Sequence, residues 1–189
     1  MKIKKAVQRS IIIVIILFLS VVIGYIYSAI GHKSDLAGHP REYSEFVEKY
    51  ASEYGIPEYI IYAVILEESN FQSNFLSDDG KIGLMQLSPE TFNTLLTMTK
   101  ESNDTGILYD PETNIKYGTY LLSYLYTGYN RWKTVFAAYL TDSDRVDYWM
   151  EYSENIDENG NLVNIPDKEI AEAVEKIEEE LEMYKKLYY

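Results

Sequence analysis

Residues 58–71 read EYIIYAVILEESNF, and this stretch decides the fold of the main part of the chain. The run from Ile60 to Leu66 is apolar on every side of a helix, which is typical of a helix that is fully buried. Pro57 comes directly before the stretch and suits the first turn of a helix, where no backbone N–H is needed. We therefore predict a buried helix from Pro57 to about Asn70, with two adjacent glutamates at its end.

The sequence on either side of this stretch also has helical patterns. Apolar residues recur at spacings of three and four from Tyr43 to Tyr54, as on one face of an amphipathic helix. Ser88-Pro89 and Asp110-Pro111 each combine an N-cap residue with a proline at the first helical position. The expected helices are, in order, residues 43–54, 57–70, 89–98, 111–126, 131–140, 143–152 and 166–189. Gly128 is expected to end the fourth of them.

Two segments have the composition of turns. Residues 71–87 are rich in Gly, Asn, Ser and Asp, which indicates a loop with a short hairpin, and residues 157–161 are typical of a turn. The sequence therefore predicts an all-α domain over residues 43–189, with one short loop and hairpin region.

The composition excludes several kinds of site. The chain of 189 residues has no cysteine, which removes disulfides, thiol nucleophiles and cysteine metal sites. Its two histidines are too few for a multi-histidine zinc site. Asp142, Asp144 and Asp147, and also residues 157–161, lack the spacing of an EF-hand. We therefore expect no metal ion and no other cofactor.

The N-terminal part has the pattern of a membrane anchor. Residues 11–30 contain no charged residue, and a helix of this length spans about 30 Å, the thickness of the apolar core of a bilayer. The basic residues of segment 1–10 favour a cytoplasmic N-terminus, which places the domain outside the cytoplasm behind a tether at residues 31–42. The alternative is a cleaved signal peptide with a weak cleavage site at residues 29–31, which would release a secreted domain.

The net charge of −13 is unevenly distributed. Residues 1–31 hold four basic residues and no acidic residue, which leaves −17 on the remainder of the chain. Such an acidic surface repels phosphate groups, so nucleic acid is not an expected partner.

Glu68 is the candidate for acid–base chemistry. It ends the most apolar helix of the domain, and apolar surroundings disfavour the charged form of a carboxyl and raise its pKa. A carboxyl that stays protonated near neutral pH can act as a general acid on a glycosidic bond. The alternative is that Glu67 and Glu68 only mark the place where the helix leaves the core.

Three sequence blocks follow one another in a fixed order. They are Glu-Ser-Asn-Phe at 68–71, Ser-Asp-Asp-Gly-Lys-Ile-Gly-Leu-Met-Gln at 77–86, and Asp-Pro-Glu-Thr-Asn-Ile-Lys-Tyr-Gly-Thr-Tyr-Leu-Leu at 110–122. Together they resemble the lytic transglycosylase catalytic domain of the soluble-transglycosylase, goose-type-lysozyme-like family, over roughly residues 43–187. The resemblance implies a lysozyme-like fold, here in a membrane-anchored form, and peptidoglycan glycan strands as the substrate.

The resemblance also implies roles for particular residues. Glu68 matches the single catalytic acid and base, which cleaves the bond between N-acetylmuramic acid and N-acetylglucosamine without water and leaves a 1,6-anhydro end. Ser69 and Gln86 would line the groove, Met85 would pack on a sugar or on the catalytic helix, and Tyr139 would hydrogen-bond near Glu68. Met85 and Tyr139 also have an interpretation as ordinary core residues.

The chain departs from the family pattern after Tyr139. Leu140 stands where the family has an asparagine that binds a sugar, and aspartates replace two loop glycines at Asp142 and Asp144. Farther on, Ala173 stands where a tyrosine is expected.

These departures leave two alternatives to the transglycosylase open. One is a hydrolytic muramidase, in which Asp78 or Asp79 positions the attacking water. The other is a domain that binds glycan without cutting it, as a scaffold in a cell-envelope machine. A membrane anchor beside a wall-cutting domain also suits a cell-envelope assembly as a partner.

Overall fold

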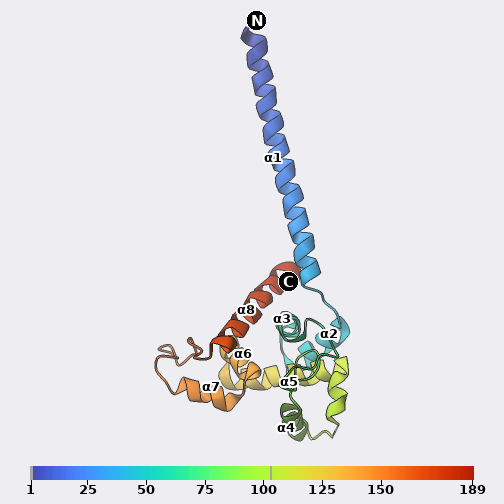
Figure 1. Ribbon diagram of the computed structural model, residues 1–189, viewed down its shortest axis with the longest axis vertical. Helices are drawn as coiled ribbons and strands as arrows, with labels where there is room; N and C mark the ends of the chain where they lie inside the picture. Colours follow the sequence, from blue (N-terminus) through green and yellow to red (C-terminus); the bar gives the residue numbers. More distant parts are fainter. Residues whose placement is uncertain (1, 103) are drawn as a thin grey trace. The chain divides into compact units, whose positions relative to one another are not determined.

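The computed structural model describes residues 2–102 and 104–189, with side chains described from residue 17 onward (Figure 1). The chain divides into two compact units, Met1–Pro40 and Arg41–Tyr189. Each unit is described here by itself.

The first unit contains helix α1, which spans Lys2–Gly38. This helix includes the predicted anchor at residues 11–30 and continues into the segment that we expected to be a tether, because no proline interrupts it before Pro40. Among the residues that the structure describes, no helix is both long enough and apolar enough to cross a membrane. The side chains of residues 11–16 lie outside that description, so the anchor stays a prediction.

The second unit is built from helices, which confirms the all-α prediction (Figure 1). In chain order they are α2 (Ser44–Tyr54), α3 (Glu58–Ser69), α4 (Pro89–Thr99), the 3-10 helix η1 (Thr105–Tyr109), α5 (Pro111–Tyr129), α6 (Trp132–Leu140), α7 (Ser143–Met150) and α8 (Lys168–Tyr188). Extended structure in the described residues is limited to isolated antiparallel bridges.

Helix α3 forms the centre of the hydrophobic core. Its side chains from Ile60 to Ile65 are completely buried, as the apolar run predicted. Helices α8 and α2 pack on it, and α5 and α8 both pack against α6. Each fully buried isoleucine or valine contributes about 1.5–3 kcal/mol to stability. The helix is therefore a rigid support for the residues that follow its last turn.

Local sequence signals fix most helix ends. Ser88 and Asp110 each accept a hydrogen bond from the backbone N–H three residues on, at 3.0 and 2.9 Å, as N-caps do. The predicted end of α5 at Gly128 is wrong. The helix continues to Tyr129, and Asn130 ends it in the left-handed conformation with φ 55°, which asparagine tolerates.

Residues 71–87 form the predicted loop and hairpin. Ile82 makes single antiparallel bridges with Leu76 and with Leu87. Ser77 closes the turn, because its N–H donates to the Lys81 carbonyl at 3.0 Å and its hydroxyl accepts the Lys81 N–H at 2.9 Å. The hairpin has a defined shape although it contains no regular strand.

Candidate active site

Glu68 lies in the last turn of α3, where the helix passes from the core to the surface. Burial raises the pKa of its carboxyl from 4.5 to about 7. The positive charge of Lys81 opposes this rise, and the negative charges of Glu67 and Asp79 add to it. The carboxyl is therefore close to half protonated at neutral pH, the condition that suits a group that must first donate and then accept a proton.

The backbone around this acid has an uncommon conformation. Asn70 and Phe71, directly after α3, have φ angles of 48° and 61°, and Gln86 has φ 50°. Asn70 ends α3 in this conformation as Asn130 ends α5, which asparagine tolerates. For Phe71 and Gln86 the left-handed conformation costs of order 1–3 kcal/mol each, and such strained positions cluster at functional sites. Packing holds the turn in place, because Phe71 is buried with its ring centre 6.4 Å from that of Tyr62.

The segment Gly83–Gln86 is fixed against the end of α3. The hydroxyl of Ser69 is buried and donates to the Leu84 carbonyl at 2.7 Å. Gly83 has φ 81°, and a Cβ at this position would collide with the side-chain amide of Asn114. Glycine is therefore required here both by the backbone angle and by the close approach of the asparagine.

Asn114 of α5 holds the other side of the same segment. Its side chain is completely buried; Oδ1 accepts the Met85 N–H at 2.7 Å, and Nδ2 donates to the carbonyls of Ile82 and Leu108 at 2.8 and 2.9 Å. Two of these hydrogen bonds hold the loop, and the third ties Asn114 to the 3-10 helix η1. The sequence analysis assigns no role to Asn114, and its place in the third block was the available signal.

Tyr139 of α6 also binds this loop. Its hydroxyl donates to the Met85 carbonyl at 2.6 Å, so its hydrogen bond goes to the backbone beside the site. Burial, and then the negative charge of Glu68, hold the pKa of this phenol well above its usual range. Tyr139 is therefore neutral and lies near enough to Glu68 to sense its charge.

The four residues expected to bind substrate all belong to, or hydrogen-bond to, the loop that is held at the end of α3. Ser69, Met85 and Gln86 are almost completely buried, at 3%, 0% and 5% exposed. The Met85 side chain packs against Gly118, which favours its core interpretation, and Gln86 Nε2 donates to the Gly83 carbonyl at 2.7 Å. Their hydrogen bonds and contacts shape the loop, and direct sugar contacts by them stay a prediction.

Two clefts open beside this site and share Thr141 and Asp142 in their walls. One has a volume of about 540 Å³, is bordered by α4 and α5, and includes Tyr139. The other has a volume of about 490 Å³ and includes Asp79 and Lys81. Glu68 is not among the residues that line either cleft, but the charges of Lys81 and Asp79 in the wall of this second cleft act on its carboxyl.

Three of the departures from the family pattern meet at this second cleft, whereas Asp144 lines the other cleft. Leu140, Asp142 and Ala173 all line it, although Ala173 comes from α8. Asp142 has a clear structural reason, because its carboxylate accepts the N–H of Arg145 at 2.7 Å and caps α7. The altered positions are therefore one connected change in the wall of the site.

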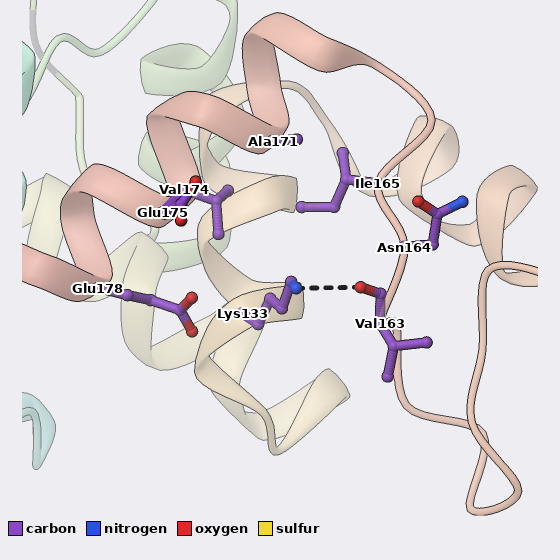
Figure 2. Close-up of a pocket in the computed structure, with 8 residues that line it drawn as sticks. All are labelled: Lys133, Val163, Asn164, Ile165, Ala171, Val174, Glu175 and Glu178. Atoms are coloured by element: carbon purple, nitrogen blue, oxygen red, sulfur yellow. Dashed lines mark hydrogen bonds between the residues drawn. The ribbon is translucent and has the colours of Figure 1, made fainter.

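A further pocket lies elsewhere, between α6, α8 and residues 163–165 (Figure 2). Lys133 donates to the Val163 carbonyl at 3.0 Å, and Figure 2 shows the Glu178 carboxylate in the same pocket. Burial raises the pKa of Glu178, and the charge of Lys133 lowers it. This pocket has no wall residue in common with the two clefts beside Glu68, and we assign no catalytic role to it.

Comparison with known proteins places these features in a family. The profile described as "Transglycosylase SLT domain" matches residues 45–162. A soluble lytic murein transglycosylase from Escherichia coli K12 is 35% identical over 117 residues, which are 59% of this chain and 18% of that protein. A membrane-bound lytic murein transglycosylase C from Haemophilus influenzae is 36% identical over 95 residues, which are 49% of this chain and 26% of that protein.

Solved structures give the same result for the fold. The 70-kDa soluble lytic transglycosylase of Escherichia coli matches 78% of this chain with a TM-score of 0.72 and 30% identity. An inactive mutant of the lytic transglycosylase Slt from Pseudomonas aeruginosa, with a glutamate changed to glutamine, matches 79% with a TM-score of 0.70 and 25% identity. In both cases the match covers 25% of the other chain, so this protein resembles one part of much longer proteins.

Proposed function

The chain belongs to the transglycosylase SLT domain family, and from that membership we propose that it is a peptidoglycan lytic transglycosylase. Its substrate is the β-1,4 bond between N-acetylmuramic acid and N-acetylglucosamine, and its product carries a 1,6-anhydro end. The observation that carries this proposal is the environment of Glu68. One carboxyl at the end of α3 has its pKa raised to about 7 by burial, and side chains of α3, α5 and α6 hold the adjoining loop in place.

The proposed reaction uses the same carboxyl twice. Glu68 first donates its proton to the glycosidic oxygen while the bond from that oxygen to C1 breaks, which leaves positive, oxocarbenium-like charge on the muramyl ring. The Glu68 carboxylate then accepts the proton of the 6-hydroxyl of the same sugar, whose oxygen bonds to C1. The leaving N-acetylglucosamine gains a 4-hydroxyl, the protonated Glu68 is restored, and no water is consumed.

A Glu68→Gln variant tests this assignment. We expect a loss of peptidoglycan clearance of about 10³-fold or more, because glutamine cannot transfer a proton and general acid–base catalysis contributes about 10²–10⁴-fold. The measurement is the fall in turbidity of a purified peptidoglycan suspension. Glu67→Gln is the matched control, since Glu67 pairs with Lys176 of α8 at 3.3 Å and is expected to be dispensable. A Glu68→Gln protein that folds and clears at the wild-type rate would refute the assignment.

A hydrolytic muramidase is the second candidate, and Asp79 is the observation in its favour. The Ser77 hydroxyl donates to Asp79, lowers the pKa of its carboxyl and so keeps it ionised. An ionised carboxylate close enough to act on Glu68 has the charge needed to orient a water molecule. The two candidates differ in the chemical end that they leave on the glycan.

We also propose that residues 11–30 anchor the protein in the cell membrane with the domain outside the cytoplasm, near partners in the cell envelope. The support is the uncharged sequence of this segment and the basic residues before it. The full chain is expected to stay in the membrane fraction after alkaline carbonate extraction, and protease added to spheroplasts is expected to digest the domain. Release by carbonate would exclude an integral anchor.

A further inference from the structure

Lys81 supplies the positive charge that opposes the rise in the pKa of Glu68. Its ammonium donates to the backbone carbonyl of Leu140 at 3.0 Å and lies 4.0 Å from the Asp79 carboxylate. The side chain is 24% exposed, so most of it is covered by the protein. Lys81 is therefore held at a defined place beside the acid and does not extend into solvent as most lysines do.

The backbone that carries Lys81 is equally well defined. Its N–H donates to the Ser77 hydroxyl at 2.9 Å, and its carbonyl accepts the Ser77 N–H at 3.0 Å. The next residue, Ile82, forms bridges on both of its sides. With the backbone fixed by the hairpin and the ammonium fixed by Leu140, the side chain spans from one wall of the cleft to the other.

The cleft that Lys81 enters lacks two polar groups that the family resemblance leads us to expect. Leu140 replaces an asparagine and Ala173 replaces a tyrosine, and both positions line this cleft together with Lys81. Neither replacement side chain can form a hydrogen bond. In this chain the contribution of position 140 to the polar environment comes from its backbone carbonyl, which binds the ammonium.

We propose that Lys81 is a positioning residue for the reaction of Glu68: its ammonium, held by the Leu140 carbonyl, stabilises the Glu68 carboxylate between proton donation and proton return. The proposal rests on the proposed function, because it concerns the step in which the Glu68 carboxylate takes a proton back from the 6-hydroxyl. Lys81 acts through Glu68. Its ammonium is a polar group in a cleft where Leu140 replaces an asparagine and Ala173 replaces a tyrosine.

The charges around Glu68 explain why such support is needed. After proton donation the carboxylate lies in poorly solvated surroundings next to the like charges of Glu67 and Asp79. Glu67 is partly neutralised by Lys176, and Tyr139 stays neutral. A sugar bound in the cleft excludes water and strengthens the attraction between the ammonium and the carboxylate.

Arg145 is the other basic residue that lines the cleft, and its interactions lie with other groups. Arg145 pairs with Asp167 at 2.6 Å, and its guanidinium lies 5.3 Å from the ring centre of Trp149. Arg145 is not among the groups whose charge acts on Glu68. It therefore offers a matched control, since its removal takes one positive charge from the same cleft without taking one from beside the acid.

The test compares the full-length wild type with Lys81→Met, Lys81→Gln, Lys81→Arg and Arg145→Met. Two midpoints are measured for each: the pH midpoint of the Glu68 carboxyl carbon by ¹³C NMR, and the alkaline midpoint of kcat/KM on peptidoglycan. Lys81→Met and Lys81→Gln are expected to move both midpoints upward by about one unit. The limiting kcat, measured where Glu68 is fully protonated, is expected to fall several-fold, by less than the tenfold that one unit represents, because a less acidic carboxyl donates its proton less readily. Lys81→Arg keeps the positive charge and is expected to show the wild-type midpoints. Arg145→Met is also expected to leave both midpoints unchanged.

The outcomes separate this inference from the proposed function. If the wild type is active and depends on Glu68 but Lys81→Met and Lys81→Gln keep the wild-type midpoints, the role of Lys81 is refuted and the function stands. If the wild type makes no product, the function fails, and the NMR midpoints alone decide whether Lys81 acts on Glu68. Thermal unfolding of each variant shows whether it is folded, and Lys81→Gln retains a donor for Leu140 if Lys81→Met does not fold.

Discussion

Glu68 shows at the scale of one residue how function limits stability. The folded state holds its carboxyl at a pKa of about 7, against an ordinary 4.5, so the folded protein binds more protons than the unfolded chain between these values. The free energy of unfolding contributed by this group therefore falls as pH rises from about 4.5 to 7, and above pH 7 the full destabilisation is present. A site built for proton transfer thus carries a stability cost at neutral pH.

This cost gives a prediction for Glu68→Gln. The variant is expected to be more stable than the wild type by about 2–3 kcal/mol at pH 8 and of nearly equal stability at pH 4, where the wild-type carboxyl is mostly protonated in both states. Urea unfolding at the two pH values measures the difference. Glu67→Gln removes only one lesser contribution to the raised pKa and is expected to gain much less at pH 8 than Glu68→Gln. An equal gain for Glu68→Gln at both pH values would contradict the burial of its charge.

At the scale of elements, the site depends on how helices α3, α5 and α6 hold one loop. Ser69, Asn114 and Tyr139 each bind a backbone group of residues 82–85, and each comes from a different helix. The loop is thereby fixed relative to the end of α3 without any regular sheet. A change in one of these side chains is expected to affect both folding and the geometry around Glu68.

Asn114→Ala tests this view. It removes the partner of the Met85 N–H and of the Leu108 carbonyl in a buried place, and each such loss costs about 1–3 kcal/mol. The Ile82 carbonyl loses one of its two donors and keeps the Leu87 N–H at 3.1 Å. We expect a total destabilisation of about 3 kcal/mol or more in urea unfolding. Asn130→Gly in the same helix is the control, since glycine suits the left-handed end of α5 and is expected to change stability little. Equal midpoints for Asn114→Ala and the wild type would contradict the role of Asn114.

Most elements could be predicted because their signals are local. The apolar run of α3 and the caps at Ser88 and Asp110 lie within a few residues of the features that they determine. The end of α5 could not be placed at Asn130, because an asparagine and a glycine two residues apart are both able to end a helix. The 3-10 helix η1 was not predicted, since it is only five residues long and has no periodic pattern.

At the scale of the whole molecule, residues 41–189 close on themselves through one cluster. The Arg41 guanidinium lies 5.4 Å from the ring centre of Tyr62 and 5.5 Å from that of Tyr189, and it pairs with Glu58 at 2.8 Å. Tyr189 also donates to Glu58 at 2.6 Å. The segment before α2, the start of α3 and the segment after α8 are thus joined, and α3 is held at the end opposite Glu68.

The candidate site could be predicted only in part, because it is assembled across the whole domain. Glu68 was identified from the apolar run before it and from its sequence block. The connection between Lys81, Leu140 and Ala173 could not be predicted, since these residues come from the hairpin, α6 and α8 and meet only in the folded chain. The buried role of Asn114 was also missed, because sequence alone does not separate a buried asparagine from an exposed one.

The most direct test of the central claim is mass spectrometry of the products formed when the full chain digests purified peptidoglycan. The transglycosylase mechanism predicts 1,6-anhydro-N-acetylmuramic acid ends from the wild type and none from Glu68→Gln. Reducing N-acetylmuramic acid ends would contradict it and identify a hydrolytic muramidase. Glycan that is bound but left uncut would contradict catalysis itself and assign the domain to glycan binding.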